Sequence, residues 1–256
     1  MKKIKRIAIT GRIAKSTAVS TAKKVIKLLE RKKVAFWVDE FFPVQKEVKP
    51  LNSIKADMVL VFGGDGTMLH AFHELKRNVP VLGINCGARG TLMALTAANA
   101  KKELSKILNG KYSLEKRGRL RVEVDGKLAE EALNEVIIVP KKAGRLLHYH
   151  VRIDGQDLGE DADDGLIIAT PTGSTAHALS AGGPKVMGNA KVFVIVRMNP
   201  IDLNRRPLLV NDNSKVEVSR FRETEIEAII DGQHRFPVKK KIVARRGKEV
   251  TFALKK

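Results

Sequence analysis

Three glycines and one aspartate lie together where an apolar run ends. The segment Gly63-Gly64-Asp65-Gly66-Thr67 follows the apolar residues 58–62 and precedes a segment with helical spacing. Glycines let a backbone come close to a ligand, and the N–H groups at the start of a helix attract phosphate oxygens. A carboxylate among phosphates is useful toward a proton or a metal ion, so Asp65 is a candidate general base or Mg²⁺ ligand. An ordinary strand-to-helix turn with a capping aspartate explains the same residues. The segment alone does not distinguish this structural interpretation from a phosphate-binding catalytic turn.

A second segment leads from an apolar run into small hydroxyl side chains. Residues 164–176 read Asp-Gly-Leu-Ile-Ile-Ala-Thr-Pro-Thr-Gly-Ser-Thr-Ala, and residues 180–184 add a further glycine turn. Small hydroxyl residues on a tight loop suit the recognition of a ribose or a phosphate, because each hydroxyl both donates and accepts hydrogen bonds. A solvated polar loop is the simpler alternative.

The elements that must position these residues change in kind near residue 115. Before it, the apolar runs 5–10, 34–38, 57–62 and 79–84 alternate with segments of helical spacing, the first of which begins with a capping Ser16 or Thr17. This alternation predicts a mostly parallel sheet with flanking helices and with ligands at the carboxyl ends of its strands.

After residue 115 the chain reads as an all-β half. Ten short β-type runs follow one another between residues 120 and 254. Hairpin signals stand at four places: Asp125-Gly126, Asp154-Gly155, Asp212-Asn213 and Arg246-Gly247.

Composition limits the class of protein. With 256 residues, 43% hydrophobic and 30% charged, the chain can bury a core, and no apolar run approaches the length that crosses a bilayer. The N-terminus lacks the apolar segment of a secretory signal, so we expect a cytoplasmic protein without a membrane partner. The single cysteine excludes an intramolecular disulfide.

The net charge of +20 is concentrated at the two ends of the chain. Residues 1–33 hold 12 Lys or Arg against one acid, and residues 235–256 hold nine against one. Such ends could attract nucleic acid or polyphosphate. A solvated, lysine-rich surface is the simpler interpretation, so we do not expect a nucleic-acid partner.

The order and spacing of the motifs resemble the NAD kinase family over nearly the whole chain. The Gly-Gly-Asp-Gly motif is shared with lipid and sugar kinases, whereas the long segment 164–176 is more specific. The resemblance also rests on residues 133–136 and 180–184, with weaker matches at 83–87, 206–208 and 231–233. It implies an α/β N-terminal domain at 1–113 with a mostly parallel sheet, an all-β C-terminal sandwich domain that binds NAD at 114–238, and a segment 239–256 that returns to the first domain.

The resemblance implies phosphoryl transfer from ATP or polyphosphate to the adenosine 2′-hydroxyl of NAD, which gives NADP. Asp65 is then the proton acceptor, and Mg²⁺ is bound mainly by the donor phosphates, with no metal ligand expected from the protein. The implied binding positions are Gly63, Gly64, Gly66, Thr67, His70, Asn85, Asn134, Glu135, Arg145, Asp164, Thr172, Thr175, Ala176, His177, Ala178, Leu179, Ser180 and Gln233.

Two further expectations concern assembly and alternatives. Asp164 matches an aspartate that often serves a neighbouring subunit in the family, which predicts a homo-oligomer, either a dimer or a tetramer. A lipid or sugar kinase with the same glycine turn remains an alternative, as does a catalytically inactive relative that binds NADP or nucleic acid.

Three positions depart from the family's pattern. Thr91 stands where an aromatic ring usually lies near the adenine, Ala162 where an arginine is common, and His177 where a tyrosine is usual. We therefore expect weak NAD binding. We also expect the acidic run 160–164 to lack a local cation unless Arg145 approaches it.

Overall fold

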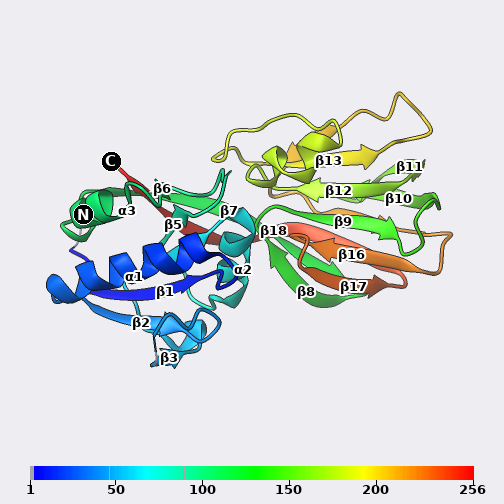
Figure 1. Cartoon of the computed structure of the whole chain (residues 1–256). Helices are drawn as coiled ribbons and strands as arrows, with labels where there is room; N and C mark the ends of the chain where they lie inside the picture. The colour runs from blue at the N-terminus through cyan, green and yellow to red at the C-terminus, as the bar shows by residue number, and fades with distance from the viewer. Residues whose placement is uncertain (1–2, 46, 89) are drawn as a thin grey trace. The chain divides into compact units, whose positions relative to one another are not determined.

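The computed structural model describes residues 3–45, 47–88 and 90–256, and the chain forms two compact units (Figure 1). The first unit contains residues 1–116 and 250–256, and the second contains residues 117–249. The predicted fold class is confirmed: an α/β unit with a mostly parallel sheet is followed by a β unit. Within the described ranges, no helix combines the length and apolar character needed to cross a membrane.

The first unit is a parallel sheet with helices on its faces. Its elements are β1 (Arg6–Gly11), α1 (Ser16–Arg31), β2 (Ala35–Asp39), β3 (Val48–Lys49), a 3-10 turn (Leu51–Ser53), β4 (Met58–Gly63), α2 (Asp65–Glu74), β5 (Val81–Asn85), β6 (Leu95–Thr96) and α3 (Ala100–Leu108). The strand order is β5-β4-β1-β2-β3, all parallel, and β6 pairs with β5. The C-terminal part of β18 adds a parallel strand beside β5 through the pair Phe252 and Val81.

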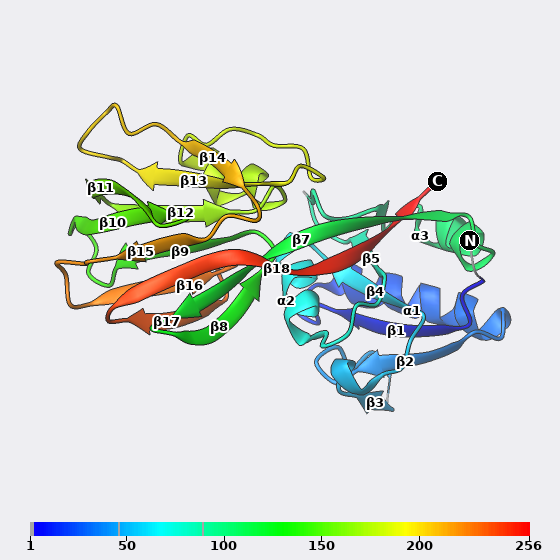
Figure 2. The ribbon, with the colours of Figure 1, turned by 180° about the vertical axis from the view of Figure 1, so that it is seen from behind.

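Helix α1 forms because its apolar residues recur every three or four positions. Ala18, Ala22, Val25 and Leu29 are buried, and Figures 1 and 2 show the helix lying along the sheet. The expected side-chain cap from Ser16 or Thr17 is wrong: the capping position is Lys15, with no side-chain cap. Packing of the apolar face therefore stabilises this helix without a capping side chain.

Strand β4 places the glycine motif at the centre of the sheet. All six of its residues are buried, which fits its continuous apolar sequence. Its neighbours β1 and β5 are both parallel to it, so the residues that end the three strands lie along one edge. Gly63 is paired with Asn85 in this register. The fold therefore brings these two predicted site residues together.

The second unit is a sandwich of two sheets. Its elements are β7 (Tyr112–Val124), β8 (Lys127–Ala132), β9 (Glu135–Pro140), β10 (Leu147–Ile153), β11 (Gln156–Asp163), β12 (Gly165–Ala169), a 3-10 turn (Gly173–Thr175), α4 (His177–Ser180), β13 (Val192–Met198), β14 (Leu208–Asn211), β15 (Val216–Ser219), β16 (Ile226–Ile230), β17 (His234–Val238) and β18 (Lys241–Lys255). One antiparallel sheet has the order β14-β13-β12-β9-β16-β17, and the other contains β11-β10-β15-β18 with β7 and β8. Inward-facing residues of both sheets, such as Ile138 and Tyr149, form the core between them.

Two of the four expected hairpins are present. Asp125-Gly126 joins β7 to β8, and Asp154-Gly155 joins β10 to β11. The other two predictions are wrong, because Asp212-Asn213 connects strands of different sheets and β18 runs straight through Arg246-Gly247. A Cβ on Gly247 would lie 3.1 Å from the Arg121 nitrogen. This glycine therefore permits a close backbone approach rather than a turn.

Candidate active site

The glycine turn leaves its backbone open toward a ligand. Gly64 precedes α2 with an extended backbone, and Asp65 is the first residue of the helix. A side chain on Gly63 would collide with that of Thr67, whereas one on Gly66 would meet nothing within 4 Å. Glycine at 63 is thus required by packing, while glycine at 66 keeps open space beside the helix N-terminus. The turn can receive a phosphate group.

The carboxylate of Asp65 is held by the loop that follows β5. Its Oδ2 accepts hydrogen bonds from the backbone N–H and the hydroxyl of Thr91, both at 2.9 Å. Its Oδ1 accepts a third from the N–H of Leu92 at 3.0 Å. From the sequence, Thr91 was noted only as a departure from the aromatic residue usual at this position. Its contact with Asp65 was missed because the hydrogen bond joins residues 26 positions apart.

Asn85 and Lys15 complete the polar edge of the first sheet. The side-chain oxygen of Asn85 accepts from the Gly87 N–H at 2.9 Å, and the Cys86 N–H donates to the Gly63 carbonyl at 2.8 Å. The Lys15 ammonium lies 2.8 Å from the point where a Cβ on Gly87 would stand. A cation from the first strand-to-helix turn therefore reaches the loop after β5, and sequence reasoning did not single it out.

His70 lies on α2, five residues after Asp65 and so on a different side of the helix. Its exposed ring meets the ring of Phe41 edge-on, with centroids 6.3 Å apart. The geometry does not bring His70 to the Asp65 carboxylate.

In the second unit, Asp231 organises the segment that contains Asn134 and Glu135. Its carboxylate accepts the backbone N–H groups of Leu133, Asn134 and Glu135 at 2.8, 2.7 and 3.2 Å. The side chains of Asn134 and Glu135 are buried where β9 begins. The weak sequence match at 231–233 indicated this part of the site, but Gln233 was the only one of its three residues that was predicted to bind a ligand. Gln233 is exposed in the turn between β16 and β17.

The carboxyl group of Glu135 binds its proton more tightly than an ordinary glutamate does. The residue is 5% exposed, and one of its carboxyl oxygens, Oε2, is buried without a hydrogen-bond partner. Burial, and secondarily the negative charge of Asp231, raise the pKa of Glu135 to about 8. At neutral pH this side chain is therefore mostly protonated and offers a ligand both an O–H donor and an acceptor oxygen.

The hydroxyl-rich loop after β12 lies against the same segment. Thr170 accepts the Gly173 N–H at 3.2 Å and donates its hydroxyl to the Leu133 carbonyl at 2.5 Å. Its backbone N–H bonds the Asn134 carbonyl, and a side chain on Gly173 would collide with Asn134. These contacts hold the beginning of the loop against Asn134. Further along the loop, Thr172 is buried and Thr175 is half-buried.

Residues 176–180 continue this loop as the short helix α4. Ala178 is buried and packs with the outer face of the six-stranded sheet. His177, Leu179 and Ser180 are exposed, and Ala176 is half-buried. The structure thus gathers Asn134, Glu135, Thr172 and residues 175–180 at one end of that sheet.

Arg145 and Asp164 lie at the other end. Glu135 and Ala169 are paired where β9 begins and β12 ends, whereas Arg145 follows β9 and Asp164 precedes β12. Five strand residues separate the two ends, which corresponds to roughly 17 Å. The Asp164 carboxylate accepts a hydrogen bond from the Asn199 side chain at 2.8 Å. Arg145 lines an open cavity of about 560 Å³ with His148 and Arg222.

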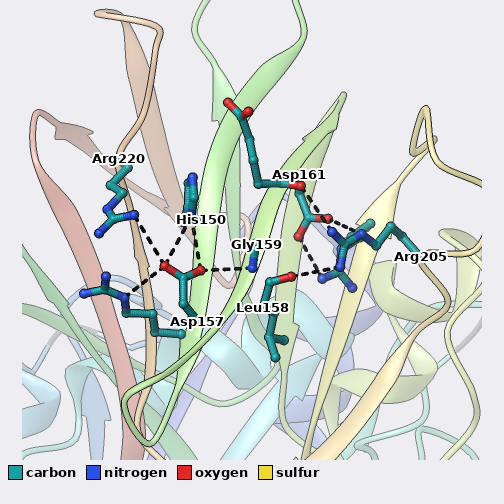
Figure 3. Close-up of polar contacts among 10 residues, drawn as sticks. His150, Asp157, Leu158, Gly159, Asp161, Arg205 and Arg220 are labelled. Atoms are coloured by element: carbon teal, nitrogen blue, oxygen red, sulfur yellow. Dashed lines mark hydrogen bonds and ion pairs between the residues drawn. The ribbon is translucent and has the colours of Figure 1, made fainter.

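The acidic run 160–164 does have cations, so the expectation that it lacks them is wrong. Buried Asp161 pairs with buried Arg197 at 2.8 Å and with Arg205 at 3.0 Å, as Figure 3 shows in part with Asp157 and its partners. Asp163 accepts the Tyr149 hydroxyl at 2.5 Å, and burial raises the pKa of Asp163 to about 7. Arg197 and Arg205 lie more than 30 residues further along the chain, so a local reading of the sequence overlooks them.

In the described ranges, His, Cys, Asp and Glu form no group of three or more that could hold a metal ion. Near the glycine turn, Asp65 offers a carboxylate that already accepts three hydrogen bonds. This donor set suits Mg²⁺ that arrives on phosphate oxygens rather than in an all-protein cage.

A parallel sheet with a Gly-Gly-Asp-Gly turn on its central strand, followed in the chain by a β-sandwich, defines the class of two-domain kinases that carry this motif. Residues 7–112 match the family model of the ATP-NAD kinase N-terminal domain, and residues 133–246 match that of the ATP-NAD kinase C-terminal domain. The chain belongs to the NAD kinase family.

Individual relatives agree over most of the chain. An NAD kinase of Thermococcus sibiricus is 36% identical over 234 residues, which cover 89% of this chain and 85% of the relative. One from Pseudomonas fluorescens is 38% identical over 250 residues, which cover 92% and 84%. A crystal structure of an Archaeoglobus fulgidus NAD kinase in complex with ATP superimposes with a TM-score of 0.83 at 26% identity, covering 96% of this chain and 92% of that one.

Proposed function

We propose that this chain transfers the γ-phosphoryl group of ATP to the adenosine 2′-hydroxyl of NAD and so makes NADP. The observation that carries the proposal is the placement of Asp65, a carboxylate at the start of α2 within the glycine turn that follows β4. Relatives named NAD kinase support the acceptor, and the ATP complex of the A. fulgidus relative supports the donor.

In this mechanism, the glycine turn and the helix N-terminus bind the donor phosphates, and Lys15 contributes positive charge beside them. The acceptor oxygen forms a bond to the γ-phosphorus while its proton passes to Asp65. The bond between that phosphorus and the bridging oxygen breaks, and ADP leaves with the electron pair. Such a transfer requires mainly positioning and charge neutralisation.

Mg²⁺ bound mainly through the donor phosphates would neutralise part of their negative charge. Within the glycine turn, Asp65 is the residue that offers a carboxylate. The protein's own part is to place the phosphates and to accept the proton.

NAD binding falls to the second unit. Asn134, Glu135, Thr172, residues 175–180 and Gln233 supply the polar and small residues for it. We assign the kinase motif to a domain at residues 1–113 and NAD recognition to a domain at residues 114–238. The last residues of the segment 239–256 have a structural role, because they add a strand to the first sheet.

Asp164 lies roughly 17 Å from Glu135, at the opposite end of the sheet, and Arg145 lies in the loop after β9. This separation fits the role at a neighbouring site that the family resemblance implies for Asp164. We therefore propose a homo-oligomer, a dimer or a tetramer, in which Asp164 serves a neighbouring site. We place the protein in the cytoplasm, without a membrane or nucleic-acid partner, and include polyphosphate beside ATP among the donors to be tested.

One incubation tests the proposal. The protein is mixed with NAD, Mg²⁺ and either ATP or polyphosphate, and NADP is detected with an NADP-specific dehydrogenase. We expect NADP to form with ATP, and the polyphosphate arm decides the donor range. Phosphorylation of a lipid or hexose but not of NAD contradicts the proposal, and so does salt-sensitive RNA binding without turnover.

A further inference from the structure

We propose that Thr91 is a positioning residue for Asp65 and that Oδ1 of Asp65 is the atom that accepts the proton. The inference rests on the proposed function, because it takes Asp65 as the base. It goes beyond it by naming the residue that orients the base and the oxygen that reacts.

The lone pairs of the carboxylate assign the reactive oxygen. An ionised carboxylate has about four lone-pair sites, two on each oxygen. Thr91 donates twice to Oδ2, from its backbone and from its hydroxyl, at 2.9 Å each. Leu92 donates once to Oδ1 at 3.0 Å. Oδ2 is therefore filled by Thr91, and a site on Oδ1 is left for an incoming hydroxyl.

The residue before Thr91 keeps the approach to Oδ1 open. A Cβ on Gly90 would lie 3.0 Å from Cγ of Met93, and 3.3 Å from both Oδ1 of Asp65 and the side-chain nitrogen of Asn85. A side chain there would crowd the oxygen that the lone-pair count leaves free. Glycine at 90 and threonine at 91 thus act on the same carboxylate, one by leaving room and the other by fixing its rotation.

The hydrogen bond to Asp65 gives the Thr91 side chain a role that an aromatic side chain at this position could not perform. The hydroxyl of Thr91 donates its hydrogen bond to Oδ2 of Asp65. A phenylalanine at this position would keep the backbone N–H bond and lose the hydroxyl bond. We therefore expect Thr91→Phe to lower kcat, whatever it does to the affinity for NAD.

The test compares three variants at an exposed position, where substitution spares the core. Thr91→Val keeps the shape and removes the hydroxyl, Thr91→Ser keeps the hydroxyl, and Thr91→Phe probes the aromatic alternative. A hydrogen bond to a charged group accounts for about a tenfold effect when lost. We expect Val and Phe to lower kcat about tenfold, Val to leave the NAD KM within about twofold, and Ser to restore kcat.

The outcomes separate this inference from the proposed function. If the wild type makes no NADP, the function fails. If the wild type is active and Asp65→Asn is as fast, the base assignment fails. If Asp65→Asn is inactive while Thr91→Val has the wild-type kcat, or while Thr91→Ser is as slow as Thr91→Val, the positioning role of Thr91 is overturned and the rest stands. Crowding at position 90 gives a second check: Gly90→Ala should lower kcat if Oδ1 is the reacting oxygen, and an unchanged kcat contradicts that assignment.

Discussion

Replacing Glu135 by glutamine should change how stability depends on pH. In the unfolded chain this carboxyl has a pKa near 4.5, and in the folded protein burial and the charge of Asp231 raise it to about 8. The folded state therefore holds a proton that the unfolded state releases. The resulting stabilisation is fully present below about pH 4.5 and is lost as the pH rises through about 8.

The size of the effect follows from the shift. One pKa unit corresponds to about 1.4 kcal/mol. Raising the pH from about 5 to about 8 therefore lowers the unfolding free energy of the wild type by roughly 3–4 kcal/mol through Glu135. Glutamine keeps the shape and cannot ionise. We expect Glu135→Gln to gain stability relative to the wild type by about that amount over this pH interval.

Urea denaturation at the two pH values measures the difference. Far-UV circular dichroism is the signal of choice, because the single tryptophan, Trp37, lies in the first unit. Asp163 titrates in the same range in both proteins, so the difference between them isolates Glu135. Glu225→Gln, at an exposed carboxylate near Lys142, is the matched control and should leave the pH dependence unchanged. Equal stability differences at both pH values would refute the buried, protonated Glu135.

Three further predictions concern charge and assembly. Arg197→Ala should cost about 3–5 kcal/mol of unfolding free energy, because it strands the buried Asp161 carboxylate; a loss below about 1 kcal/mol by urea denaturation contradicts that pairing. Lys15→Met should raise the donor KM about tenfold, while Lys23→Met and Lys24→Met, exposed on α1, should leave it unchanged; equal effects would mean that Lys15 acts only through the general charge of the surface. Light scattering at micromolar protein should give a multiple of the chain mass, and a fully active monomer would remove the role proposed for Asp164.

Much of the fold could be predicted because periodicity is a local signal. The buried run 58–62 and the spacing of α1 directly reflect the faces they bury. Three strands of the second unit were missed for a physical reason: β8 and β11 have largely polar sequences, and β17 contains Pro237. In the first unit, β3 and β6 were missed because each has only two residues. Helix α3 was also missed, although Ala100, Leu104, Ile107 and Leu108 follow helical spacing. Five of its nine residues are polar, which made the apolar spacing of the other four easy to overlook.

The site could be predicted only in part. Motif resemblance placed Asp65, Asn134 and Glu135, and the fold brings each beside other polar residues of its own unit. The partners that hold them came from far along the chain: Thr91 bonds Asp65 and Asp231 bonds the segment 133–135. Such contacts depend on the sheet register and cannot be read from spacing.

In the proposed reaction, Asp65 in its glycine turn accepts the proton when NAD is phosphorylated. The most direct measurement is the rate of NADP formation by Asp65→Asn relative to the wild type, with ATP and Mg²⁺ saturating and with circular dichroism confirming that both proteins are folded. General-base catalysis contributes about 10²–10⁴-fold, so we expect Asp65→Asn to lose activity by a factor of that size. A rate within about threefold of the wild type would contradict it.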